Sequence, residues 1–190
     1  MSFRLYPVAQ HWWSFSDYGA VIDVMQRTQA RRILEFGPGS STLALIEGGA
    51  TSVDACEDDP RWVDLYRERL ERRFAGAVAI VPYCWADPLT IPSIDQRHYD
   101  LALIDGPRET PKRLAVIEYC LARCREVLVP TEQHDGMMMI REAVERLAAA
   151  RGRPQCKTET GPHAGAIALQ GPPSRPVCAG AGASYSPMAT

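Results

Sequence analysis

A short apolar segment that runs through glycines into hydroxyl residues constrains this chain most. Residues 32–42 read Arg-Ile-Leu-Glu-Phe-Gly-Pro-Gly-Ser-Ser-Thr. Ile33, Leu34 and Phe36 predict a buried strand, and the glycines after them predict a tight turn. Any of the hydroxyl residues 40–42 can cap a helix that continues to about residue 47. A strand joined through glycines to a helix N-terminus is typical of a nucleotide-type ligand site, because free N–H groups and a close backbone face the ligand.

Composition limits the class of protein. The chain has 190 residues, 46% of them hydrophobic, which is enough for one domain with its own core. Its 21 basic and 23 acidic residues give a formal charge of −2 and no electrostatic case for nucleic acid or an anionic membrane. It has neither an apolar run long enough to span a membrane nor a signal-peptide core, so we expect a cytoplasmic protein. Its six cysteines form no Cys-x-x-Cys pair, which favours reduced thiols over a disulfide framework or a zinc site.

The rest of the chain alternates predicted strands and helices. Strands are expected at 32–36, 52–56, 78–81, 99–104 and 126–129, and helices at 16–29, 41–47, 60–74, 110–122 and 137–149. Two further strands, 155–160 and 166–170, read as a hairpin. The predicted fold is therefore α/β and Rossmann-like, a doubly wound, mostly parallel sheet of about seven strands with a C-terminal antiparallel hairpin.

Three regions follow from this pattern. Residues 1–31 form an N-terminal aromatic arm and helix, residues 32–170 form the ligand-binding domain, and the Gly-, Pro-, Ala- and Ser-rich residues 171–190 form a disordered tail. The arm either covers the ligand as a lid or packs on the core. In a sheet of this kind ligands bind beyond the carboxyl ends of the strands, so the polar residues at those ends are the candidates for a site.

Two acids at strand ends indicate the ligand. Glu57 lies 20 residues after Gly37, where a carboxylate can accept hydrogen bonds from both hydroxyls of a ribose. Glu35 stands before the glycine turn and would repel a dinucleotide pyrophosphate, and Thr42 occupies the place of the third glycine that a dinucleotide site favours. S-adenosylmethionine instead presents a cationic amine and a sulfonium, which suit Glu35. Electrostatics therefore favours S-adenosylmethionine.

Three segments together resemble the class I S-adenosylmethionine-dependent methyltransferases. They are Glu-x-Gly-x-Gly at 35–39, the acid Glu57, and Tyr-Asp-Leu-Ala-Leu-Ile-Asp-Gly-Pro at 99–107. The resemblance covers about residues 32–170 and is closest to small O-methyltransferase-like members, although many members have a third glycine at the position of Ser41. It implies methyl transfer from S-adenosylmethionine to a small-molecule acceptor, at a hydroxyl oxygen.

The resemblance also implies positions for the cofactor. Its methionine part would lie against Glu35, Gly37, Pro38 and Gly39, with its carboxylate near Ser41 and Thr42. Glu57 would bind the ribose and Asp58 would flank the adenine. The segment Trp85, Ala86, Asp87 would meet the adenine ring, with core packing as an equal alternative for Trp85, and Asp105 would lie next to the transferred methyl group.

A hydroxyl acceptor must also lose its proton. Asp105, His134 and Asp135 follow two neighbouring strands, and His134 is the natural general base near neutral pH. Alternatively, Asp105, Glu132 or Asp135 hold Mg2+, which would orient a diol acceptor. A third interpretation is that His134 and Asp135 only cap the following helix.

Two other functions remain open. A nucleic-acid methyltransferase is disfavoured by the charge balance and by Asp-Gly-Pro-Arg at 105–108, where such enzymes carry an Asn-Pro-Pro-Tyr-like segment. A Rossmann-like cofactor- or partner-binding protein without turnover is the non-enzymatic alternative. Little sequence is inserted late in the chain to build an acceptor pocket. We therefore expect the pocket to draw on residues 1–18 or on a second subunit of a homodimer. Arg108 and Lys112 either bind an anionic acceptor or are solvated charges.

Overall fold

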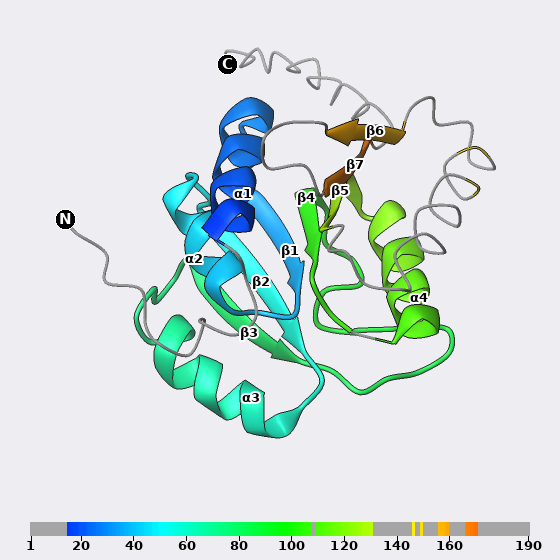
Figure 1. Cartoon of the computed structure of the whole chain (residues 1–190). Coiled ribbons are helices and arrows are strands. Elements are labelled where there is room, and N and C mark those ends of the chain that lie inside the picture. Colours follow the sequence, from blue (N-terminus) through cyan, green and yellow to red (C-terminus); the bar gives the residue numbers. More distant parts are fainter. Residues whose placement is uncertain are drawn as a thin grey trace, which may run out of the picture.

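The computed structural model describes residues 15–107, 109–130, 146, 149, 156–159 and 166–170. Seven strands, four α-helices and a π-turn fall within these ranges (Figure 1). The helices are α1 (Phe15–Thr28), α2 (Ser40–Glu47), α3 (Pro60–Tyr66, followed by the π-turn Arg67–Glu71) and α4 (Thr110–Leu121). The strands are β1 (Arg32–Phe36), β2 (Ser52–Glu57), β3 (Val78–Pro82), β4 (Tyr99–Ile104), β5 (Cys124–Pro130), β6 (Cys156–Glu159) and β7 (Ala166–Gln170).

The strands form one sheet in the order β3-β2-β1-β4-β5-β7-β6. The five strands from β3 to β5 are parallel, which confirms the predicted parallel α/β sheet. β7 runs antiparallel to β5, and β6 runs antiparallel to β7. The chain moves outward from β1 to β3 and then returns to β4 on the other side of β1. This reversal places the ligand crevice of such a fold beyond the carboxyl ends of β1 and β4.

Hydrophobic clusters cover both faces of the sheet. Ile33 of β1 and Leu103 of β4 belong to the cluster that contains buried residues of α1, α2 and α3. Leu34 and Ile104, one position along the same strands, belong to the cluster that contains buried residues of α4. Figure 1 shows α4 on the opposite side of the sheet from α1 and α2. Both faces of β1 and β4 are therefore buried, as the nearly continuous apolar sequence of these strands requires.

The helix after β2 differs from its prediction. Asp59 caps it as expected, because its side chain accepts a hydrogen bond from the Arg61 N–H at 2.9 Å. The α-helix ends at Tyr66, where a π-turn begins, and the N–H of Arg72 bonds to the carbonyl of Arg67 at 2.9 Å. Trp62, which helical spacing places on the same side as buried Leu70, is 37% exposed. Its ring stacks on Tyr66, one turn further along, rather than on the sheet.

The segment between β3 and β4 also contributes side chains to the hydrophobic core. Its sequence is polar and rich in proline, yet Leu89, Ile91 and Ile94 are buried in the cluster on the α4 face of the sheet. Apolar side chains from an irregular segment therefore cover part of this face, where a doubly wound fold more often places a helix.

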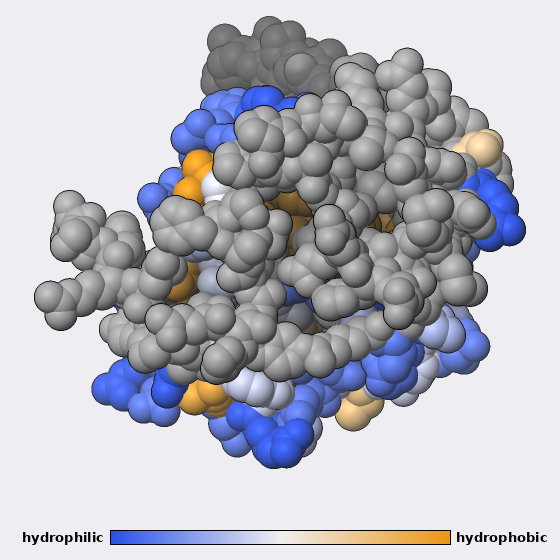
Figure 2. Space-filling model, viewed as in Figure 1, coloured by the Kyte–Doolittle hydropathy of each residue, from blue (hydrophilic) through white to orange (hydrophobic). Residues whose placement is uncertain are grey.

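Several predictions lie outside the described residues. They are the aromatic arm up to residue 14, the tail 171–190, most of the helix 137–149, and the side chains of Arg108, Glu132, His134 and Asp135. In the view of Figure 2 the described part of the surface is mostly hydrophilic, with a few hydrophobic residues between. Within the described ranges, no helix has the length and apolar character needed to cross a bilayer.

Candidate functional site

Two glycines lock the carboxyl ends of β1 and β4 together. Gly37 has a φ of +83°, and its N–H donates to the carbonyl of Cys56 at 3.1 Å. The carbonyl of Phe36 accepts the N–H groups of Asp105 and Gly106, both at 2.9 Å. A Cβ on Gly37 would lie 2.8 Å from the nitrogen of Gly106, so no side chain fits between the two strand ends. Bare backbone therefore joins the two strand ends at the point where the strand order reverses.

Glu35 lies buried beneath this turn and is bound by the first turn of α2. Its two carboxyl oxygens accept the hydroxyls of Ser41 at 2.5 Å and Thr42 at 2.7 Å. The N–H of Gly39 in turn donates to the Thr42 hydroxyl at 3.1 Å. Ser41 and Thr42 were predicted to touch a ligand carboxylate, but both side chains are fully buried and their hydroxyls hold Glu35 instead. The side chain of Glu35 thus connects β1 to the first turn of α2.

Burial sets the protonation of Glu35. Its removal from water raises the pKa of the carboxyl to about 8, and the charge of Asp105 acts in the same direction. The hydrogen bonds from Ser41 and Thr42 favour the ionised form and offset only part of this effect. Glu35 is consequently protonated through much of the neutral range unless a cation is bound nearby.

Glu57 is fixed at the end of the neighbouring strand β2. One oxygen of its half-buried carboxyl accepts the backbone N–H groups of Asp58 and Asp59, both at 3.0 Å. Burial raises the pKa of Glu57, and these backbone bonds oppose the rise. Because the backbone engages one carboxyl oxygen, the other remains for a ligand. Asp58 itself is exposed.

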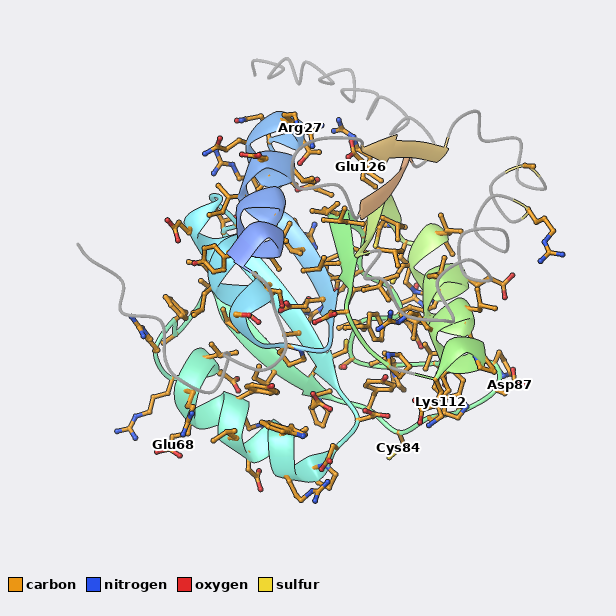
Figure 3. The ribbon with its side chains drawn as sticks, in the orientation of Figure 1. Arg27, Glu68, Cys84, Asp87, Lys112 and Glu126 are labelled. Carbon is orange, nitrogen blue, oxygen red and sulfur yellow. The ribbon has the colours of Figure 1, made fainter. Side chains whose placement is uncertain are left out.

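Trp85 lies between the core and a lysine. Its half-buried ring packs against the hydrophobic cluster on the α4 face. The ammonium of Lys112 lies 5.8 Å from the centre of the ring and pairs with Glu109 at 3.2 Å. Ala86 and Asp87, which follow Trp85, are exposed. Figure 3 shows Asp87 and Lys112 in the same region of the molecule.

Asp105 is half-buried at the end of β4, and α4 fastens the backbone around it. The guanidinium of Arg113 donates to the carbonyls of Asp105 and Pro107, the latter at 2.8 Å. No sequence pattern indicates this contact, because arginine on a helix face usually indicates a solvated residue. Arg113 therefore contributes to the position of the strand-four acid.

Two hydroxyl residues of this crevice were also missed. Tyr66 at the end of α3 has its hydroxyl oxygen 4.0 Å from the place where a Cβ of Gly39 would stand. Ser40, next to Gly39, has a buried hydroxyl with no hydrogen-bond partner among the described residues. No sequence signal identifies Tyr66, because an aromatic residue at helical spacing usually indicates the core.

Metal binding gains no support from the described residues. Within them, no group of three or more His, Cys, Asp and Glu side chains is placed to hold a metal ion. Asp105 is described, whereas Glu132 and Asp135 lie outside these ranges.

Solved structures share this architecture. An O-methyltransferase from Bacillus cereus in complex with SAH has a TM-score of 0.63 and 21% identity, over 84% of this chain and 83% of that one. TomG, an O-methyltransferase from Streptomyces achromogenes involved in tomaymycin synthesis and solved with SAM, has a TM-score of 0.62 and 20% identity, over 84% and 82%. A candidate RNA methyltransferase from Pyrococcus horikoshii has a TM-score of 0.61 and 14% identity, over 92% of each chain.

The fold is that of the class I methyltransferases. No family model matches the chain, and no curated protein matches it. At identities of 14–21% these neighbours share the fold, so the activity has to be argued from the site.

Proposed function

We propose that the chain is an S-adenosylmethionine-dependent methyltransferase that acts on a hydroxyl oxygen of a small molecule. One observation carries this proposal: the buried acid Glu35 lies under the glycine turn at the switch point, and Glu57 is fixed at the end of the next strand. Neighbours of the same fold were crystallised with SAM or SAH. We also propose that the β6–β7 pair beside β5 forms the end of a seven-stranded methyltransferase sheet.

The described residues fit S-adenosylmethionine. Among them, only the Tyr66 hydroxyl comes within 4.0 Å of a Cβ built on Gly39, so there is room above this glycine. The unpartnered hydroxyl of Ser40 and the second carboxyl oxygen of Glu57 provide polar partners. Glu35 provides a negative charge once a cation lies near it. When bound, S-adenosylmethionine supplies an electrophilic methyl group.

Each site residue has a role in the proposal. Gly37, Pro38 and Gly39 hold the methionine part, with Glu35 beneath them, and the backbone N–H groups of Ser41 and Thr42 face the same end. Glu57 accepts the ribose hydroxyls, and the adenine lies among Asp58, Trp85, Ala86 and Asp87. Asp105 lies beside the reacting centre, where alignment of the nucleophile accounts for most of the catalysis.

We assign removal of the acceptor's proton to residues that follow β4 and β5. We propose His134 as general base, with Asp105 and Asp135 beside it, which gives the acceptor oxygen its nucleophilic form. In a second version of the proposal, Asp105, Glu132 or Asp135 hold Mg2+. An assay with and without magnesium separates the two, because only the second version loses activity in EDTA.

Calorimetry tests the cofactor. S-adenosylmethionine and S-adenosylhomocysteine should bind, and NAD should not; preferential NAD binding would overturn the proposal. Glu57→Gln should weaken S-adenosylmethionine binding by about 1–3 kcal/mol, the usual effect of losing a charged hydrogen-bond partner. Glu68→Gln, an exposed residue of the π-turn, is the matched control and should leave the affinity unchanged.

A turnover screen tests the acceptor. Phenols, sugars and carboxylic acids are offered with a labelled methyl donor, alongside RNA. The likeness to a candidate RNA methyltransferase makes RNA the competing acceptor, and the formal charge of −2 argues against it. Methylation of RNA and of none of the small molecules would replace the proposed substrate class. Failure of the whole panel, in a protein that binds the cofactor, would favour a binding protein without turnover.

A further inference from the structure

The ring of Tyr66 is held at the edge of the candidate site. It stacks on Trp62, with ring centres 5.5 Å apart and planes 20° from parallel. Among the described residues, the Tyr66 hydroxyl is the group that comes within 4.0 Å of a Cβ built on Gly39. The phenol therefore reaches from α3 toward the turn that begins α2.

The hydroxyl of Tyr66 has no hydrogen-bond partner in the described part of the chain. The hydroxyl of Tyr83 likewise forms no hydrogen bond within the described residues, whereas three other tyrosines behave differently. The hydroxyls of Tyr18, Tyr99 and Tyr119 each donate to a carboxylate at 2.7 Å. The Tyr66 hydroxyl, which lies next to the Gly39 turn, is therefore available to donate to a ligand.

The surroundings of Tyr66 keep its hydroxyl protonated, so that it can donate a hydrogen bond. Burial raises the pKa of the phenol, and the charges of Glu57, Glu35 and Asp105 raise it further. The hydroxyl therefore stays neutral and carries its proton throughout the physiological range.

The helix geometry changes directly after Tyr66. The backbone widens into a π-turn, in which the N–H of Arg72 reaches the carbonyl of Arg67. Single π-turns inside helices often occur at functional sites, where the extra residue re-aims a side chain. This feature supports a ligand contact at the end of α3.

We propose that Tyr66 contacts the cofactor and that its hydroxyl donates a hydrogen bond to the carboxylate of the methionine part. This inference rests on the proposed function. The amine of the cofactor carries only donors and suits the acids, whereas its carboxylate needs donors. Tyr66, near Gly39, and the unpartnered hydroxyl of Ser40, the next residue after Gly39, supply two of them. Together with the first N–H groups of α2, they close the methionine end of the site from two helices.

The experiment compares two ligands that share the nucleoside. S-adenosylhomocysteine carries the carboxylate, and 5′-methylthioadenosine lacks the amino-acid part. Tyr66→Phe should bind S-adenosylhomocysteine at least about ten-fold more weakly, the usual effect of losing one bond to a charged group, and bind 5′-methylthioadenosine with unchanged affinity. Its unfolding in urea should match that of the unmodified protein, because no bond within the described residues is lost.

Tyr18→Phe is the matched control. It removes the same hydroxyl from a tyrosine that bonds to Glu47 at the other end of α2, and it should leave both affinities unchanged. Equal weakening of both ligands by Tyr66→Phe would overturn the carboxylate assignment, and so would no weakening of either. An unmodified protein that binds neither ligand would overturn the proposed function and this inference with it.

Discussion

Replacing Glu35 with glutamine removes a buried acid while keeping its size and shape. In the native protein burial raises the pKa of this carboxyl from 4.5 to about 8. The native state therefore binds more protons than the unfolded chain between these values, and the free energy of unfolding must fall as the pH rises through this window. Stability from the protonated acid is complete below pH 4.5 and is lost once the pH exceeds about 8. Glutamine cannot ionise and shows no such fall.

The size of the effect follows from the shift. A difference of about 3.5 pKa units corresponds to about 5 kcal/mol when the carboxyl is fully ionised. Between pH 5 and pH 8, about 3 kcal/mol of this should be lost, since ionisation of the native state is incomplete at the upper limit. The Glu35→Gln variant should therefore gain about 3 kcal/mol relative to the unmodified protein over this interval.

Urea unfolding at several pH values, without cofactor, measures this difference. The control is Glu68→Gln, which removes an exposed carboxyl and should track the unmodified protein at every pH. A difference between Glu35→Gln and the unmodified protein that is constant from pH 5 to pH 8 would refute the idea that burial keeps Glu35 protonated. A difference that changes with the opposite sign would mean that the hydrogen bonds from Ser41 and Thr42 outweigh burial.

Three substitutions test the packing around the site, each by urea unfolding. Tyr99→Phe should lower the free energy of unfolding by about 1–3 kcal/mol, because buried Asp54 loses a bond of 2.7 Å. Gly37→Ala should cost more than about 2 kcal/mol, since it adds a clash with Gly106 to the strain of a positive φ. Arg113→Met should cost about 1–3 kcal/mol and also weaken cofactor binding, because it frees the backbone that carries the strand-four acid.

Each of these has a control within the chain. Gly76 has a φ of +84° with open space around it, so Gly76→Ala should show the backbone strain alone. Equal losses of unfolding free energy for Gly37→Ala and Gly76→Ala would show that the contact with Gly106 is not the cause. Tyr18→Phe and Arg125→Met act at exposed bonds or exposed positions and should have little effect. Losses as large as those of the buried counterparts would show that burial is not the cause.

Local signals predicted the strand–turn–helix at 32–47 well. The apolar run, the glycines and the hydroxyls act over a few residues, and the structure has a strand to Phe36 and a helix from Ser40. The cap at Asp59 was predictable for the same reason, because a side chain and an N–H two residues away decide it. The parallel sheet also followed from the alternation of strands and helices.

Long-range contacts were not predictable. The hydroxyls of Ser41 and Thr42 turn inward because Glu35 lies buried beneath them, and only the folded chain shows this. Trp62 shares the apolar side of its helix by spacing, yet in the folded chain it is exposed and stacked on Tyr66. The ligand contact proposed for Tyr66 depends on the approach of α3 to the turn at Gly39. The roles of His134 and Asp135 stay predictions.

The irregular cover between β3 and β4 gives the two walls of the crevice different rigidity. The wall at β1 and α2 is tied by helix hydrogen bonds and by the bonds to Glu35. The wall behind Trp85 rests on a segment held by the burial of Leu89, Ile91 and Ile94. A segment of this kind opens locally at a lower free energy than a helix or a central strand. Amide hydrogens of residues 83–90 should therefore exchange with solvent well before those of β1, and mutations in this segment can reshape the proposed adenine end of the site while the end at β1 and α2 stays intact.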